Sequence, residues 1–408
     1  MIPISEAAEI IRRETFRLEA ETIDLGKSVG RVLAQEIRAD TDLPPFDRSQ
    51  MDGFAVRAED AKDAPVRLKI IGEAVAGRGF GGEIKKGEAV RIMTGAPVPA
   101  GAGAVQKVEL TRETGDYIEI LEAAKEKQNI ILRGEEIEKG AKVFAAGEII
   151  TENMIASLAS FGCARIKVGA QPKVSILATG SELVDVSETP QQDQIRNSNS
   201  LMLDVFARKT GAKTEVLPLV NDDFETLKNQ IAEAVGLSDE SRISNPESQI
   251  LLITGGVSVG DYDFTKPALR ELGAEIFFEK VSLKPGKPTV FAKLNDRLIF
   301  GLPGNPVSVA VTFHLFVRAA LLQMQGARDC ELKKGFAVTP EKIKAAKERD
   351  SVLPVSLQTD ENGTLVIESL RFRGSSNFVA FSRADALVFV PQGAVLEAGT
   401  AAQIAYLP

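Results

Sequence analysis

The alternation of hydrophobic and polar positions predicts a helix at the start of the chain. Ala7, Ile10 and Ile11 fall on one side at helical spacing, Ser5 stands where an N-cap is expected, and acidic residues occupy the first turn. Residues 42–46 then contain two successive prolines, which end any helix and favour an extended chain.

Residues 46–140 have a different pattern, in which short hydrophobic runs are separated by many glycines. The runs that resemble strands are residues 66–71, 89–93 and 117–121. Short strands joined by glycine-rich turns predict a small β domain. A helical pattern returns at residues 151–161 and stops at Gly162. The β domain is therefore expected to be an insert in a helical and linker part of the chain.

From residue 171 onward, runs of strand length alternate with helical patterns. The predicted strands are residues 173–178, 215–220, 250–254, 275–283, 289–294 and 298–302. Helices are predicted near residues 200–209, after Asp222 and Asp223, before Gly273, and over about residues 306–324. This alternation predicts a doubly wound α/β domain, whose parallel sheet is covered by helices on both faces.

The last part of the chain returns to a strand pattern. Residues 354–358 and 364–367 flank Asn362 and Gly363, a pair typical of a hairpin turn. The predicted fold class is therefore α/β with all-β parts. The predicted domains are residues 1–45 with 141–170 (helical and linker), 46–140 (inserted β), 171–326 (α/β) and 327–408 (C-terminal β).

Composition narrows the classes of function. The chain has 408 residues, of which 44% are hydrophobic and 26% charged, as in an ordinary globular protein. Its formal net charge of −8 argues against general binding to nucleic acid or a membrane surface, although a local basic pocket stays open. A single histidine, His314, excludes a site with several histidine ligands within one chain. It lies in an apolar run that is typical of a packed helix, so we interpret it as a packing residue.

The cysteine content and the N-terminus bear on the compartment. Two remote cysteines, Cys163 and Cys330, exclude a disulfide framework and favour a reducing compartment. The first residues lack the basic and apolar regions of a signal peptide, and we expect no apolar run that approaches the length of a membrane-spanning helix, about 18 residues. We therefore predict a soluble, cytoplasmic protein.

Polar and glycine-rich segments follow three of the predicted strands. They are residues 179–182, 221–223 and 255–263. Each segment taken alone is typical of helix capping. Ligands of doubly wound sheets bind at the carboxyl ends of strands, however, so three such segments together predict a site. The loop with Gly255, Gly256 and Gly260 can bring backbone N–H groups to an anion, but it lacks the Lys-Ser/Thr of a P-loop.

A basic segment, residues 280–288, contains Lys280, Lys284 and Lys287, and residues 301–306 form a rigid Gly- and Pro-rich loop. Lysines act as point charges near phosphates, and carboxylates near phosphates usually imply a divalent cation. Each segment is also compatible with a simple solvated turn. Together with the strand ends, they predict a polyanionic ligand, a divalent cation, and chemistry at phosphorus or at an oxyanion.

Several strings resemble the molybdopterin molybdenumtransferase family, the molybdenum-cofactor insertases, which is also similar to the C-terminal domain of gephyrin. They are residues 42–55, 92–99, 178–183, 255–263, 283–288 and 301–308, in order over nearly the whole chain. The resemblance implies an elongated four-domain homodimer, with an α/β domain similar to the molybdopterin adenylyltransferase fold. It also implies a Mg²⁺-dependent reaction in which adenylylated molybdopterin and molybdate give molybdenum cofactor and AMP.

The resemblance also implies roles for individual residues. Catalytic roles fall to Asp52, Thr94, Glu182, Asp222 and Asp263, and the last three are also expected to hold Mg²⁺. Asp52 and Thr94 are expected to face the α/β site of the other subunit. Substrate contacts are expected from Gly255, Gly256, Ser258, Lys280, Lys284, Lys287, Pro303, Pro306 and Glu136.

This sequence departs from some relatives at a few positions, and other functions stay open. Glu136 stands where relatives carry Asp, and Ile131 and Leu132 replace arginines. The alternatives are a non-catalytic molybdopterin carrier or scaffold and a molybdopterin adenylyltransferase. The intact acidic set argues against the first, and the complete Asp52 and Thr94 strings argue against the second. Contact with an adenylyltransferase and with acceptor molybdoenzymes is a further expectation, and tungstate is an alternative to molybdate.

Overall fold

The computed structural model describes residues 1–237, 248–257, 263–368, 370, 374 and 376–408. Within it the chain forms two compact units. The first contains residues 1–35, 146–155 and 165–408, and the second contains residues 36–145 and 156–164.

The first unit is built around a six-stranded sheet with the strand order β16-β13-β17-β21-β20-β18. Its strands are β13 (Lys173–Ala178), β16 (Lys213–Val216), β17 (Ile250–Thr254), β18 (Glu275–Phe278), β20 (Val290–Leu294) and β21 (Arg297–Leu302). The first four strands in this order are parallel, whereas β20 and β18 are antiparallel to their neighbours. The sheet that the sequence predicts to be parallel therefore has an antiparallel edge.

The antiparallel edge has a local cause in the link between β20 and β21. Asn295 and Asp296 are the two residues between these strands, and both have positive φ, at 48° and 59°. Such a pair forms the tight hairpin turn that suits antiparallel strands. A parallel connection needs a crossover of a dozen or more residues, so this link can only reverse the chain.

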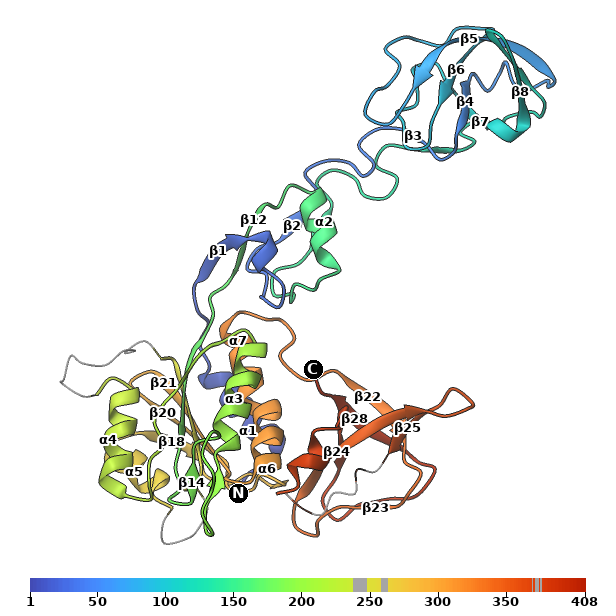
Figure 1. Cartoon of the computed structure of the whole chain (residues 1–408). Helices are drawn as coiled ribbons and strands as arrows, with labels where there is room; N and C mark the ends of the chain where they lie inside the picture. The colour runs from blue at the N-terminus through green and yellow to red at the C-terminus, as the bar shows by residue number, and fades with distance from the viewer. Residues whose placement is uncertain (238–247, 258–262, 369, 371–373, 375) are drawn as a thin grey trace. The chain divides into compact units, whose positions relative to one another are not determined.

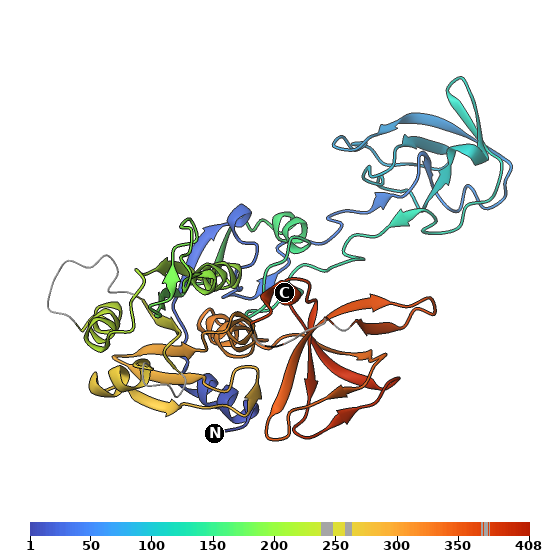
Figure 2. The ribbon, with the colours of Figure 1, turned by 60° about the horizontal axis from the view of Figure 1, so that its bottom comes forward.

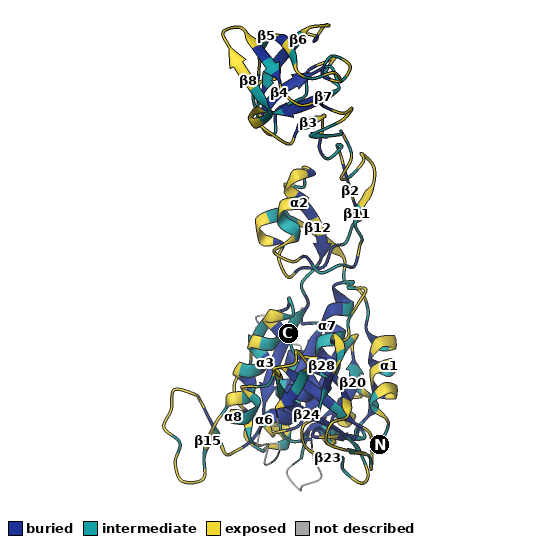
Figure 3. Ribbon diagram, turned by 90° about the vertical axis from the view of Figure 1, so that its right-hand side faces the viewer, coloured by how far each residue is buried: buried dark blue, intermediate teal, exposed yellow. Residues whose placement is uncertain are grey.

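Helices cover both faces of this sheet. They are α1 (Ile4–Glu14), α3 (Ser198–Lys209), α4 (Phe224–Ala234), α5 (Thr265–Glu271) and α6 (Pro306–Thr312). Helices α4 and α5 pack on one face, and α1, α3 and α6 pack on the other (Figure 1). Ile176 and Leu252 belong to the α3 side, while their neighbours Leu177 and Ile253 belong to the α4 side. This alternation buries the central strands on both faces (Figure 3).

Helix α6 continues through a π-helical turn (Phe313–Val317) into α7 (Arg318–Met324). The whole helix, Pro306–Met324, is long and apolar enough to cross a membrane by length and composition alone, which corrects the prediction that no run approaches that length. Within the fold, however, 78% of its apolar window is buried. Its side chains belong to the main hydrophobic core, as those of a core helix do.

Some element boundaries also differ from the prediction. Pro3 occupies the N-cap position of α1, so Ser5 lies inside the helix and does not cap it. The strand predicted at residues 215–220 is shorter in the structure, since β16 ends at Val216. Val220 lies beyond that end and makes an isolated bridge with Thr179. The predicted strand at residues 275–283 is divided into β18 and β19 (Leu283–Lys284), because β19 pairs with the C-terminal sheet.

The C-terminal sheet has the order β19-β24-β25-β22-β28-β26. Its further strands are β22 (Lys334–Val338), β24 (Asp350–Thr359), β25 (Leu365–Glu368), β26 (Ala386–Val390) and β28 (Ala401–Tyr406). An additional pairing between β24 and β26 closes the sheet on itself (Figure 2). The predicted hairpin is confirmed, since β24 and β25 are antiparallel and Gly363 in their turn has a φ of 80°. Smaller elements of this region are α8 (Phe378–Phe381), β23 (Ile343–Lys344) and β27 (Val395–Leu396).

The second unit contains a sheet with the order β7-β4-β6-β5-β9-β8. Its strands are β4 (Gly53–Val56), β5 (Val66–Ala74), β6 (Glu88–Ile92), β7 (Ala104–Lys107), β8 (Thr111–Thr114) and β9 (Tyr117–Ile120). Three of these confirm the strands predicted from the hydrophobic runs. Short pairs join β2 (Ile37–Arg38) to β11 (Lys142–Phe144) and β3 (Arg48–Ser49) to β10 (Ile130–Ile131).

The remaining short elements include α2 (Met154–Ser160), followed by Gly162 at a φ of 72°, which confirms the predicted helix stop. Others are β1 (Ala20–Asp24), β12 (Arg165–Gly169), β14 (Leu183–Val184) and β15 (Ile195–Arg196). In the first unit, β1 pairs antiparallel with β12, and β12 leads directly into β13.

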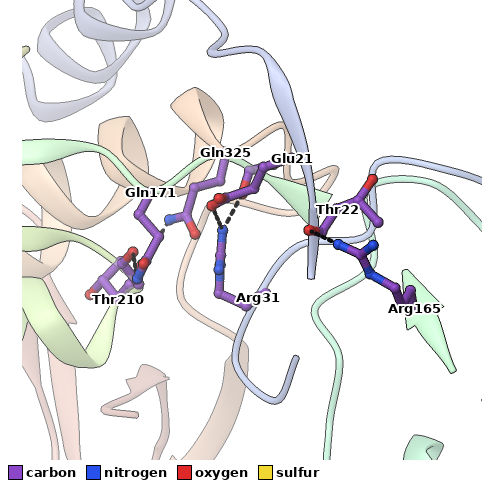
Figure 4. A network of polar contacts seen from close by, with 9 residues as sticks. Glu21, Thr22, Arg31, Arg165, Gln171, Thr210 and Gln325 are labelled. Atoms are coloured by element: carbon purple, nitrogen blue, oxygen red, sulfur yellow. Dashed lines mark hydrogen bonds and ion pairs between the residues drawn. The ribbon is translucent and has the colours of Figure 1, made fainter. Parts of the chain in front are cut away.

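A network of polar contacts fixes this entry into the α/β sheet (Figure 4). Arg31 is only 8% exposed, and its Nη2 donates to the carbonyl of Gly169 at 2.7 Å and to the carboxylate of Glu21. Nearby, Nε2 of Gln325 donates to the carbonyl of Thr210 at 2.8 Å. Arg31 therefore ties β1 to the end of β12, a few residues before β13 begins.

The core position of His314 predicts a pH dependence of stability. The side chain is 6% exposed, and burial lowers its pKa from 6.5 to about 3, with a smaller effect of the Arg318 and Lys209 charges. Between these values the unfolded chain binds a proton that the folded chain does not, so stability falls as pH decreases from about 7 toward 3. The loss at pH 5 relative to pH 7.5 is about 2 kcal/mol from this group.

His314→Phe removes the titrating group and keeps a ring against Phe206 and Phe313. Denaturant unfolding at pH 7.5 and pH 5 should therefore show a smaller loss of unfolding free energy in the variant than in the unchanged protein. Phe313→Leu, in the same turn, is the control and should keep the full loss. An equal loss in His314→Phe would show that the histidine titrates normally.

Candidate active site

Three strand ends of the α/β sheet meet at a cavity of about 300 Å³. It lies beyond the carboxyl ends of β13 and β17, the usual ligand position in such sheets. It is lined by Thr179, Gly180, Glu182, Asp222, Gly255, Gly256, Val257, Asp263, Pro288 and Gly304. The predicted residues Glu182, Asp222, Asp263, Gly255 and Gly256 thus come together here, whereas Ser258 lies outside the described residues.

Position 255 requires glycine because of its backbone conformation and a close approach. Its φ is 96°, and a Cβ there would lie 2.2 Å from the carbonyl oxygen of Thr179. The Gly255 N–H donates to the carbonyl of Leu302 at 3.3 Å, so this donor is already used within the fold. For Gly256 the predicted backbone contact to an anion stays a prediction.

Asp222 and Asp223 have different roles although they are adjacent. Asp223 is the N-cap of α4, where Oδ1 accepts from the Thr226 N–H at 2.8 Å, and the contacts with Thr226 lower the pKa of Asp223. Asp222 instead lines the cavity. Its Oδ2 accepts from the Ser181 N–H at 3.0 Å, and its own N–H donates to Ser181 Oγ at 3.0 Å. This reciprocal pair holds two strand-end loops together and orients the Asp222 carboxylate.

The carboxylates of Glu182, Asp222 and Asp263 supply oxygen ligands of the kind that Mg²⁺ prefers. They do not form a three-carboxylate cage, since no group of three or more His, Cys, Asp or Glu side chains in the described part of the chain could hold an ion. Mg²⁺ usually takes one or two protein carboxylates and completes its shell with water and phosphate oxygens. The donor set therefore fits a cation shared with a phosphorylated ligand, and the choice among the three carboxylates stays a prediction.

The predicted lysines do not line this cavity. Lys284 lies in β19, is exposed, and lines a separate cavity of about 360 Å³ beside the C-terminal sheet. Lys287 is exposed and Lys280 is partly buried. Their segment reaches the strand-end cavity through Pro288, which sequence reasoning did not select. Pro288 belongs to the string at residues 283–288 that resembles the family, and this string is the sequence feature that could have indicated it.

Neither of the two predicted prolines, Pro303 and Pro306, lines this cavity. Pro303 is buried, and its carbonyl accepts from Thr254 Oγ1 at 3.2 Å. Pro306 begins α6 and lines a different cavity. The residue of this loop that lines the site is Gly304, which was part of the predicted loop but was not chosen.

Asp52 and Thr94 belong to the second unit and form a pair there. Asp52 precedes β4 and Thr94 follows β6, and the antiparallel register of these strands sets Gly53 opposite Ile92. Oδ1 of Asp52 accepts from the Thr94 N–H at 2.7 Å and from Thr94 Oγ1 at 2.8 Å. These hydrogen bonds, the backbone one first, lower the pKa of Asp52. The pair is exposed, so it presents an ionised carboxylate to solvent at neutral pH.

Glu136 also lies in the second unit. Its Oε1 pairs with Nη2 of Arg48 at 3.1 Å, and both side chains are exposed. Arg48 lies opposite Ile131 across the short β3–β10 pair. The Glu136 carboxylate therefore already has a protein partner, and its contact with substrate stays a prediction.

The Asp52–Thr94 contact can be tested by titration. Thr94→Val removes the Oγ1 donor and keeps the N–H, so the pKa of Asp52 should rise while the carboxylate keeps one donor. Thr94→Ser keeps both donors and should leave that pKa unchanged. Carboxyl-carbon NMR of Asp52 against pH measures both variants, and an unchanged midpoint in Thr94→Val would contradict the role of the hydroxyl.

Three family profiles match successive parts of the chain. The MoeA N-terminal region (domain I and II) matches residues 2–162, a probable molybdopterin binding domain matches residues 175–323, and the MoeA C-terminal region (domain IV) matches residues 337–407. Together they span almost the whole sequence.

Individual relatives agree with these profiles. A molybdopterin molybdenumtransferase of Staphylococcus aureus (strain COL) is 35% identical over 396 residues, which is 96% of this chain and 92% of the relative. The protein of the same name from Staphylococcus epidermidis is 33% identical with the same coverage. A crystal structure of the molybdopterin biosynthesis MoeA protein from Pyrococcus horikoshii OT3 has a TM-score of 0.83 at 29% identity and covers 100% of both chains. The predicted family and fold class are thereby confirmed, and the chain belongs to the molybdopterin molybdenumtransferase (MoeA) family of molybdenum cofactor biosynthesis.

Proposed function

We propose that this chain inserts molybdate into adenylylated molybdopterin, with cleavage of the pyrophosphate bond to AMP, and releases molybdenum cofactor and AMP. The observation that supports this most is the convergence of Glu182, Asp222 and Asp263 on one glycine-walled cavity at the strand ends. Carboxylates that line a cavity at strand ends are typical of sites where a divalent cation and a phosphorylated ligand bind together.

The residues of the cavity have separable tasks in this reaction. Gly255 and Gly256 have no side chains and allow a ligand close to the backbone, and Val257 is buried behind them. Asp222 is held by Ser181 and therefore keeps a fixed position relative to both loops. A preoriented carboxylate does not need to reorganise when the ligand binds, which favours catalysis.

Mg²⁺ is the cation that the family resemblance implies. Glu182, Asp222 and Asp263 are the residues that would hold it, together with phosphate oxygens of the ligand. When bound, the cation supplies positive charge to those oxygens and stabilises the charge that develops as the phosphoanhydride breaks. The protein carboxylates contribute by fixing the position at which that charge is delivered.

The surroundings of the reaction are also part of the proposal. The protein acts in the cytoplasm as a homodimer, in which the Asp52–Thr94 pair of one subunit completes the α/β site of the other. The ionised Asp52 carboxylate then adds a further fixed negative charge beside the cation. Transient contact with a molybdopterin adenylyltransferase, which supplies the substrate, and with acceptor molybdoenzymes completes this proposal.

Adjacent aspartates provide a matched test of the carboxylate site. Asp222→Asn keeps an oxygen for the Ser181 N–H but removes the charge, so AMP release from adenylylated molybdopterin with Mg²⁺ and molybdate should fall at least tenfold. Asp223→Asn is the control, because asparagine caps a helix as well as aspartate does, and release should change less than twofold.

The binding of the substrate separates this function from its alternatives. Substrate binding should persist in Asp222→Asn while turnover is lost. Full turnover in this variant would remove the carboxylate from the site. Tight binding without AMP release by the unchanged protein would favour a carrier or scaffold, and AMP incorporation from ATP would favour the adenylyltransferase.

A further inference from the structure

Asn199 lies beside the strand-end cavity, at the start of α3. Its Nδ2 donates twice, to Thr254 Oγ1 at 3.0 Å and to the carbonyl of Gly304 at 2.7 Å. Gly304 lines the cavity, and Thr254 is the last residue of β17, directly before Gly255. One carboxamide therefore joins α3 to two parts of the site that come from different strands.

The contact continues through Thr254, which is 2% exposed. Its hydroxyl accepts from Asn199 and donates to the carbonyl of Pro303 at 3.2 Å. The loop after β21 is thus held at two successive carbonyls, Pro303 by the threonine and Gly304 by the asparagine. The Gly304 acceptor is a backbone carbonyl, and the Thr254 hydroxyl donates its hydrogen to Pro303, so the carboxamide has to present its NH₂ group to both.

The other end of the carboxamide has no partner among the residues that the structure describes. Oδ1 of Asn199 is buried and accepts no hydrogen bond from any of them. A buried acceptor is normally satisfied, and an unpaired one lowers stability. What Asn199 contributes to the fold is therefore the pair of hydrogen bonds from Nδ2, to Thr254 Oγ1 and to the Gly304 carbonyl.

We propose that Asn199, acting with Thr254, is a positioning residue that sets the Gly304 wall of the cavity for the phosphorylated ligand. It need not touch the reacting atoms. It holds the Gly304 loop against the Gly255 loop: a Cβ on Gly304 would lie 4.0 Å from the Cα atom of Gly255, which is close to van der Waals contact. Both glycines line the cavity, so a shift of the Gly304 loop would change the shape of its wall. This inference rests on the proposed function for the identity of that ligand.

The test compares variants that break the contact in different ways. Asn199→Ala removes both Nδ2 bonds, Asn199→Asp keeps the shape but offers oxygen to the Gly304 carbonyl, and Thr254→Val removes the linking hydroxyl at nearly constant volume. Each should raise KM for adenylylated molybdopterin and Kd for AMP, measured by calorimetric titration, about tenfold, with kcat within threefold. The Asn199→Ala and Thr254→Val effects should not add in the double variant, because both act on the same loop.

Asn197→Ala is the matched control. Asn197 caps α3 through the Ser200 N–H at 3.2 Å, so its loss weakens the same helix without touching the loop. It should lower Tm as much as Asn199→Ala while leaving KM and the AMP Kd unchanged. Two results would overturn the inference. One is equal ligand affinity in the unchanged protein and in both Asn199 variants. The other is a loss of affinity in Asn197→Ala that follows the fall in Tm.

The two proposals fail in different ways. If the unchanged protein binds AMP but releases none from adenylylated molybdopterin, the function fails, and the AMP titrations of the variants still decide the role of Asn199. If AMP release is normal in every Asn199 and Thr254 variant, the function stands and the positioning role fails.

Discussion

The registration of three parallel strands is the constraint on which the site depends. Ala178 of β13 lies opposite Thr254 of β17, which in turn lies opposite Leu302 of β21. The strands therefore end at the same level, and the loops that follow them emerge side by side. A shift of one residue in any pair would turn the buried side chains of that strand to the wrong face, so the hydrophobic core holds this register in place.

Glycine and hydrogen-bonding side chains then convert three loop starts into a cavity. Gly255 permits contact with Thr179 that any Cβ would prevent. Asp222 and Ser181 link the loops after β13 and β16, and Asn199 and Thr254 link those after β17 and β21. Each link uses a side chain from a strand end or a helix start, where the backbone direction is fixed by the sheet. The geometry of the site thus follows from the packing of the core.

The strand ends could be predicted because they depend on local pattern and on a general rule of parallel sheets. The segments after β13, β16 and β17 were found in this way, whereas the choice of Glu182, Asp222 and Asp263 within them came from the family resemblance. The antiparallel edge could not be found so readily, since it depends on the backbone of two residues, Asn295 and Asp296. Sequence alone also could not separate the capping Asp223 from the site residue Asp222, because both are aspartates at a helix start.

Residues that act through long-range contacts were the hardest to predict. Asn199 and Gly304 are separated by 105 positions, and no pattern in the sequence connects them. The placement of Lys284 beside the C-terminal sheet depends on the pairing of the two-residue strand β19, which is too short to leave a periodic signal. The four-domain division stays a prediction. The roles of the lysines, of Glu136 and of the Asp52–Thr94 pair stay predictions as well.

The most direct measurement of the central claim is AMP release from adenylylated molybdopterin by the purified protein, with Mg²⁺ and with or without molybdate. The account predicts AMP release that requires Mg²⁺ and is stimulated by molybdate, with transfer of the metal to the pterin dithiolene. Bound substrate that stays intact under the same conditions would contradict it.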